Sequence, residues 1–150
     1  MPSRQLLAFQ IGCWAALVSA AVHLAGHIIG PQPTTPAEAT VLQVASNVVL
    51  QLPGASRSLM DLFSGFSLAL ALFLAFWGGL GLMLARRARH DGPLMYAVAR
   101  TMAGAAVILL VISLTDWFIV PSVCIAMMAI SFAVAAVRAP DMGSGLGSQP

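Results

Sequence analysis

Two histidines and two aspartates are the residues of this 150-residue chain whose types and spacing could form a chemical site. His23 and His27 are four apart, so both imidazoles project from one side of a helix. Asp61 and Asp116 stand at matching ends of later apolar segments, and Arg57 precedes Asp61. Ionisable groups at membrane depth usually face a bundle interior and find partners there. We therefore expect these five residues to form one polar cluster, with either a ligand-binding or a structural role.

Several kinds of chemistry are compatible with this cluster. Two histidines one turn apart plus a carboxylate commonly hold zinc or iron, and here the ligands would be His23, His27 and Asp116. A quinone or lipid pocket would use the same groups to hydrogen-bond a polar head. Bis-histidine haem is disfavoured, because its second ligand would be His90 on the other side of the membrane. The simplest expectation is no cofactor, with zinc, iron or quinone as alternatives.

The two aspartates differ in how easily a local role explains them. Ser58 and Asp61 have the spacing of an N-cap with an acidic third residue, which would use the carboxylate structurally. Asp116 stands at a helix C-terminus, where the helix dipole disfavours a carboxylate. It therefore needs a cation or donor from elsewhere, for which His23, His27 and Arg57 are the candidates, and we expect His23 to approach it.

Composition places this cluster in a membrane protein. The chain is 59% hydrophobic and 8% charged, whereas soluble domains carry about 25% charged residues. This excludes a disordered chain, a nucleic-acid binder and an ordinary cytosolic enzyme. Membrane lipids are the expected partners, together with another membrane protein or a second copy of the chain.

Four apolar runs are long enough to cross a bilayer as helices, which needs about 20 residues and at least about 17. None of them alternates with a period of two, so strands are not expected there. We predict an all-α, polytopic four-helix bundle in a single domain over 1–138, followed by a flexible tail over 139–150. The predicted spans are about 6–30, 59–85, 94–120 and 121–137.

The arginines predict the orientation. With both termini cytoplasmic, six of the seven arginines lie inside and only Arg57 lies outside, as the positive-inside rule requires. The first run could alternatively be a signal peptide cleaved after Ala20. This is disfavoured, because its apolar stretch is about twice as long as the hydrophobic region of a usual signal peptide. The six inner arginines are Arg4, Arg86, Arg87, Arg89, Arg100 and Arg138.

The loop between the first two spans is predicted to contain an amphipathic helix over 36–52. Thr35 and Glu38 have capping-box spacing, and Pro36 takes the first helical position. Pro53-Gly54 would end the helix. Its apolar face, which should lie on the membrane or close the bundle, comprises Val41, Leu42, Ala45, Val48 and Leu52.

Small residues recur along one face of the first span, which is typical of close helix packing in membranes. We expect this stripe to pack inside the bundle, with a dimer interface as the alternative. Cys13 and Cys124 fall at different depths and cannot form a disulfide. The stripe comprises Gly12, Ala16, Ser19, His23, Gly26 and Gly30.

Short segments of the chain resemble small bacterial inner-membrane proteins of the DoxX-like type. They are Val22–His27, the proline-rich loop, the segment 58–66 and the segment 117–121. The resemblance implies a four-helix protein of the bacterial inner membrane and assigns no catalytic residue. We expect a non-enzymatic accessory or small-ligand-binding module. The alternative is a metal- or quinone-dependent membrane oxidoreductase, and a transporter is less favoured because no span has a charge near its midplane.

Overall fold

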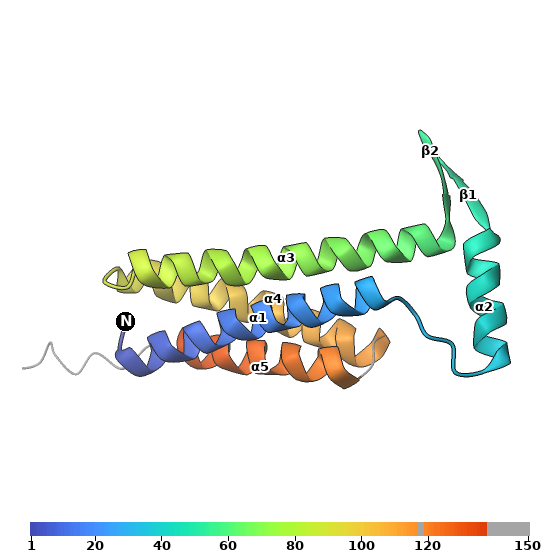
Figure 1. The fold of residues 1–150 in the computed structure, drawn as a ribbon. Coiled ribbons are helices and arrows are strands. Elements are labelled where there is room, and N and C mark those ends of the chain that lie inside the picture. The colour runs from blue at the N-terminus through green and yellow to red at the C-terminus, as the bar shows by residue number, and fades with distance from the viewer. Residues whose placement is uncertain (117–118, 138–150) are drawn as a thin grey trace, which may run out of the picture.

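The computed structural model describes residues 1–116 and 119–137, and the side chains of 116–120 lie outside the described set. Apart from one short hairpin, the described chain is helical (Figure 1). The elements are α1 (Ser3–Ile29), α2 (Pro36–Asn47), β1 (Val49–Leu52), β2 (Ala55–Ser58), α3 (Leu59–Arg87), α4 (Gly92–Asp116) and α5 (Ile119–Ala136).

Three of the helices, α1, α3 and α4, are long and apolar enough to cross a membrane, judged by length and composition. The described part of α5 is a shorter apolar helix, Pro121–Ala136. These helices coincide with the four predicted apolar runs, with ends that differ by a few residues. The fold is therefore all-helical in its main body, with at least three candidate membrane spans.

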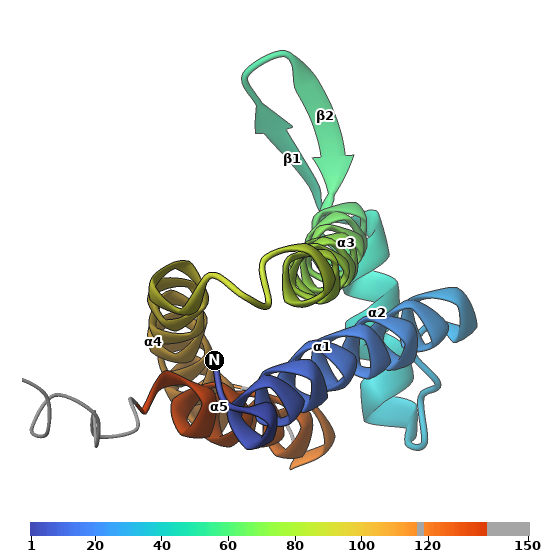
Figure 2. The ribbon, with the colours of Figure 1, turned by 90° about the vertical axis from the view of Figure 1, so that its left-hand side faces the viewer.

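The four long helices run side by side, and α2 lies across one end of them (Figures 1 and 2). α3 packs against α1, α1 against α5, and α5 against α4. We refer to the end that carries α2 and the β1–β2 hairpin as the hairpin end. The opposite end, with the N-terminus and the α3–α4 link, is the link end.

The core of the link-end half is built on aromatic rings and small residues. The Phe132 ring packs edge-on against Phe9, with centroids 5.5 Å apart, and stacks on Trp77 at 6.4 Å. A Cβ placed on Gly12 would lie 2.7 Å from the Phe132 ring, so only glycine fits there. Gly78 is equally tight, because a Cβ there would lie 2.7 Å from the backbone oxygen of Cys13. The small residues in this half therefore let the helices pack closely, as expected from the stripe.

Polar contacts tie the helix ends together at the link end. The Gln5 side chain donates to the backbone carbonyl of Val137, just after α5. Tyr96 of α4 donates its hydroxyl proton to Gln5 Oε1 at 2.7 Å. The starts of α1 and α4 and the end of α5 therefore lie at one level.

The predicted helix over 36–52 is wrong in its second half. α2 ends at Asn47, and Val49–Leu52 pairs antiparallel with Ala55–Ser58. Val48 and Val49 are β-branched and favour extended backbone. Pro53-Gly54 forms the two-residue turn of this hairpin, with Gly54 at φ 82°. The dipeptide therefore reverses the chain between two strands instead of ending a helix.

The start of α2 follows the expected capping pattern with one change. Thr35 Oγ1 accepts from Glu38 N at 3.2 Å. The Glu38 carboxylate accepts from the backbone N–H and the hydroxyl of Thr34, at 2.6 and 2.8 Å. These hydrogen bonds hold the pKa of Glu38 below its ordinary value. In a capping box the Glu38 carboxylate would accept from the backbone N–H of the N-cap residue Thr35. Here it accepts from Thr34, one residue earlier in the chain.

Candidate functional site: a pocket at the hairpin end

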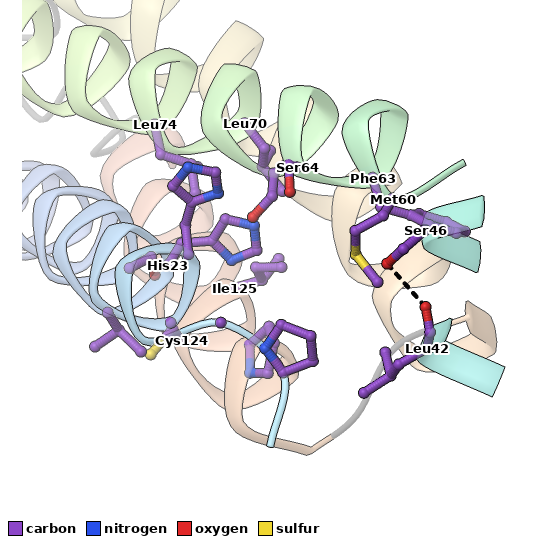
Figure 3. A pocket seen from close by; sticks show the side chains of 18 residues that line it. His23, Leu42, Ser46, Met60, Phe63, Ser64, Leu70, Leu74, Cys124 and Ile125 are labelled. Carbon is purple, nitrogen blue, oxygen red and sulfur yellow. Dashed lines mark hydrogen bonds between the residues drawn. The ribbon is translucent and has the colours of Figure 1, made fainter. Parts of the chain in front are cut away.

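A cavity of about 860 Å³ lies at the hairpin end, between α1, α3 and α5 (Figure 3). Leu42 and Ser46 of α2 contribute to its lining from across the end of the bundle. Its volume falls within the range of about 300–1,000 Å³ that is typical of small-molecule sites. The apolar lining comprises Val22, Leu42, Met60, Phe63, Leu70, Leu74 and Ile125 together with Pro31, Pro121 and Cys124.

Polar side chains line this pocket from two facing helices. Ser19, His23 and His27 follow one another at four-residue steps on α1 and share one face. Ser64 and Ser67 of α3 line the same cavity, and Figure 3 shows His23 and Ser64 on its facing walls. Among the side chains that the structure describes, the lining contains no Asp, Glu, Lys or Arg. Its polar groups are therefore hydroxyls and imidazoles, which can each donate and accept hydrogen bonds.

Ser19 is the most deeply buried of these polar residues, with 9% of its surface exposed. Its Oγ is buried and has no hydrogen-bond partner among the described residues. A buried hydroxyl without a partner costs about 1–3 kcal/mol. A water molecule or a bound ligand in the pocket would supply the missing hydrogen bond.

Two of the predicted cluster residues, Asp61 and Arg57, do not line the pocket. The Asp61 carboxylate accepts from Ser58 N at 3.0 Å, and Ser58 Oγ accepts from Asp61 N at 3.0 Å. This is the capping box considered from the sequence, and that local role is confirmed. Arg57 is exposed on β2, opposite Leu50 of β1.

The predicted metal set cannot be assembled from the described side chains. The side chain of Asp116 lies outside them, so its expected approach to His23 stays a prediction. Among the side chains that are described, no three of His, Cys, Asp or Glu lie close enough to hold a metal ion. His90 follows α3 at the link end, at the other end of the bundle from His23. Cys13 and Cys124 are free thiols, as predicted.

The sequence interpretation missed part of this site. The small-residue stripe indicates only a packing role for Ser19, and the predicted cluster does not include Ser67. Ser64 and Ser67 are three apart in the mainly apolar first half of α3, which places both hydroxyls on one face. That pairing, opposite the face with Ser19 and His23, is the signal that could have found the second wall.

The small-residue stripe of α1 changes its role at this end. Gly26 lines the pocket, and a Cβ placed there would meet no described atom within 4 Å. The same stripe that packs tightly at Gly12 therefore borders open space here.

Comparisons of this chain with protein-family models, curated proteins and solved structures found no match.

Proposed function

We propose that this chain is a multi-pass membrane protein that binds one amphipathic molecule in the pocket at its hairpin end. The ligand has an apolar body and a neutral head that accepts or donates hydrogen bonds, as in a quinone or an isoprenoid alcohol. The observation that carries this proposal is the buried Ser19 hydroxyl, which has no partner among the described residues, in a mainly apolar cavity that also holds His23 and His27.

Membrane placement rests on four crossings, with α5 as the shortest. Its 18 residues rise about 27 Å at about 1.5 Å each, close to the hydrocarbon thickness of about 30 Å. α5 starts at the pocket level and ends beside Gln5 at the start of α1. It therefore runs along most of α1, which supports a fourth span.

The arginines support a cytoplasmic link end, in the bacterial inner membrane that the resemblance implies. Arg4 begins α1, and Arg86, Arg87 and Arg89 lie where α3 ends, all at the link end. Arg57 lies at the hairpin end. Under the positive-inside rule the pocket then faces the outer leaflet.

The chemistry of the lining supports a binding role without catalysis. Apolar walls with a few placed polar groups are typical of small-molecule sites. The hydroxyls and imidazoles could hydrogen-bond both a carbonyl and an alcohol head. The metal-dependent alternative depends on Asp116, whose side chain is outside the described set.

Binding of decyl-ubiquinone to the purified protein, followed by calorimetry in detergent, tests this proposal. We expect saturable binding at one site per chain. Gly26→Leu should abolish it by filling the pocket, and Gly65→Leu is the matched control because a Cβ there also meets nothing within 4 Å. Gly65 does not line the cavity. His23→Leu and Ser19→Ala should each weaken binding about 2- to 10-fold, the worth of one hydrogen bond.

Farnesol serves as a second probe, because it offers an alcohol in place of the quinone carbonyls. Binding of either probe that Gly26→Leu abolishes and Gly65→Leu preserves supports the pocket as the site. Absence of saturable binding for both probes, or equal loss in the two glycine variants, contradicts the proposal.

A further inference from the structure

The β1–β2 hairpin has two chemically different faces, because neighbouring strand residues point to opposite sides. The register pairs Leu50 with Arg57 and Leu52 with Ala55 on one face. Gln51 pairs with Ser56 and Val49 pairs with Ser58 on the other face, where the Gln51 and Ser56 side chains hydrogen-bond at 2.7 Å. One face is therefore apolar with a single cation, and the other is mainly polar.

The hairpin projects sideways from the bundle. Figure 1 shows it rising across the direction of the long helices, and Figure 2 shows it pointing away from them beside α3. Membrane helices tilt on average only about 20° from the bilayer normal. A hairpin that leaves the helix end sideways therefore lies over the lipids next to α3.

The surface of α3 below the hairpin is suited to lipid. Phe66, near its start, is 73% exposed and, unlike Phe63, does not line the pocket. The hairpin itself contacts α2 and α3 through β2. Leu50 and Leu52 remain 38% and 40% exposed, and Arg57 is exposed as well. The apolar face therefore remains exposed at the hairpin end.

We propose that this face of the hairpin lies on the membrane surface at the hairpin end and binds phospholipid. Leu50, Leu52 and Ala55 contact the acyl boundary, and the Arg57 guanidinium pairs with a lipid phosphate. An apolar surface edged by a cation is the pattern of interfacial binding, and guanidinium suits phosphate geometrically. The inference rests on the membrane placement proposed above and is independent of the pocket ligand.

Adjacent positions on the two faces provide the test. Leu50→Cys and Gln51→Cys are each labelled with the fluorophore NBD, in a Cys124→Ser background where Cys13 is buried. The protein is reconstituted in phosphatidylcholine liposomes with phospholipids that carry a doxyl quencher on carbon 5 of one chain. We expect doxyl lipid to quench the label at 50 at least twice as strongly as the label at 51. Aqueous iodide should show the reverse order.

Arg57→Gln should reduce the doxyl quenching at position 50 toward the value at 51, because the phosphate contact is lost. Equal quenching of both labels by iodide would mean that the hairpin stands in water and would overturn the proposal. Shielding of both labels from iodide without doxyl quenching would indicate a protein partner and would overturn it too. Decyl-ubiquinone binding is measured on protein that keeps Cys124, which lines the pocket, and reports on the pocket separately, so either proposal can fail alone.

Discussion

The two halves of the bundle use the same kinds of residue in opposite ways. In the link-end half, Gly12 faces the Phe132 ring and Gly78 faces the backbone of Cys13, with no room for a methyl group. In the hairpin-end half, Gly26 borders a cavity of about 860 Å³. One half is closely packed and the other is hollow and partly polar.

The difference shows that a small residue on a helix does not by itself indicate close packing, because it can equally border a cavity. Gly12 packs closely because α5 places a large ring against it, whereas none of the described side chains fills the space beside Gly26. In membranes, helix association depends on close van der Waals contact and interhelical hydrogen bonds. We infer that the link-end half supplies most of the stability and that the hairpin-end half is free to bind.

Phe132→Ala should have the largest effect on this comparison. Phe132 is fully buried and contacts both Phe9 and Trp77. Its removal leaves a cavity, and we expect a loss of about 2–4 kcal/mol in unfolding free energy, somewhat less than in soluble cores because lipid replaces water outside. Thermal or denaturant unfolding in detergent measures it. Phe76→Ala is the control, because the Phe76 ring is 69% exposed, and its unfolding free energy should change little. Equal losses of unfolding free energy in the two variants would mean that the link-end half is not the more stable half.

Gly78→Ala should have the next largest effect. The added Cβ would lie 2.7 Å from the Cys13 carbonyl oxygen, which is backbone and cannot rotate away. Overpacking of this kind costs about 1–3 kcal/mol. Gly79→Ala is the adjacent control, because a Cβ there meets nothing within 4 Å. A melting temperature that is lowered in Gly78→Ala but not in Gly79→Ala would support the close contact between α1 and α3 at Gly78. Unchanged stability in both variants would contradict this contact.

Ser113→Ala tests how the pocket wall on α5 is held. Ser113 and Ser122 are buried, and their hydroxyls lie 2.7 Å apart between α4 and α5. Interhelical hydrogen bonds in membranes average about 0.6 kcal/mol, so we expect a loss of about that size. Decyl-ubiquinone affinity should fall slightly if this bond holds Pro121 in the pocket wall. A loss comparable to that of Phe132→Ala would show that the hairpin-end half also contributes strongly to stability.

The smallest expected effect concerns the pH dependence of α2, which spans the pocket end. Glu38 accepts hydrogen bonds from Thr34, and these lower its pKa when the helix is folded. Its stabilisation is therefore present above the unfolded pKa of about 4.3 and is lost as the pH falls through the lower folded value. Amide hydrogen exchange in the first turn of α2 should quicken at acid pH beyond the intrinsic change. Glu38→Gln should remove this dependence, and an identical profile in the variant would contradict the assignment.

Local features were predictable because they depend on residues a few positions apart. The Ser58–Asp61 capping box and the Thr35 N-cap follow from spacing along one chain segment. The end of α2 was missed because Pro53-Gly54 can either end a helix or turn a hairpin. Propensity alone did not decide between them, since the strand Val49–Leu52 forms only when its partner Ala55–Ser58 is present.

The sequence by itself determined an all-helical chain with apolar helices and placed His23 and His27 on one helix face. These properties follow from composition and from the period of the helix. Only the tertiary structure decided that Ser19, His23, Ser64 and Ser67 share a pocket and that Asp61 does not. A pocket depends on which side chains face one another across helices, and that is set by packing at distant points such as Gly12 and Phe132. The prediction of one polar cluster used only the depth of each residue along the helices. Because it did not include the rotation of each helix about its axis, it grouped side chains that do not face the pocket.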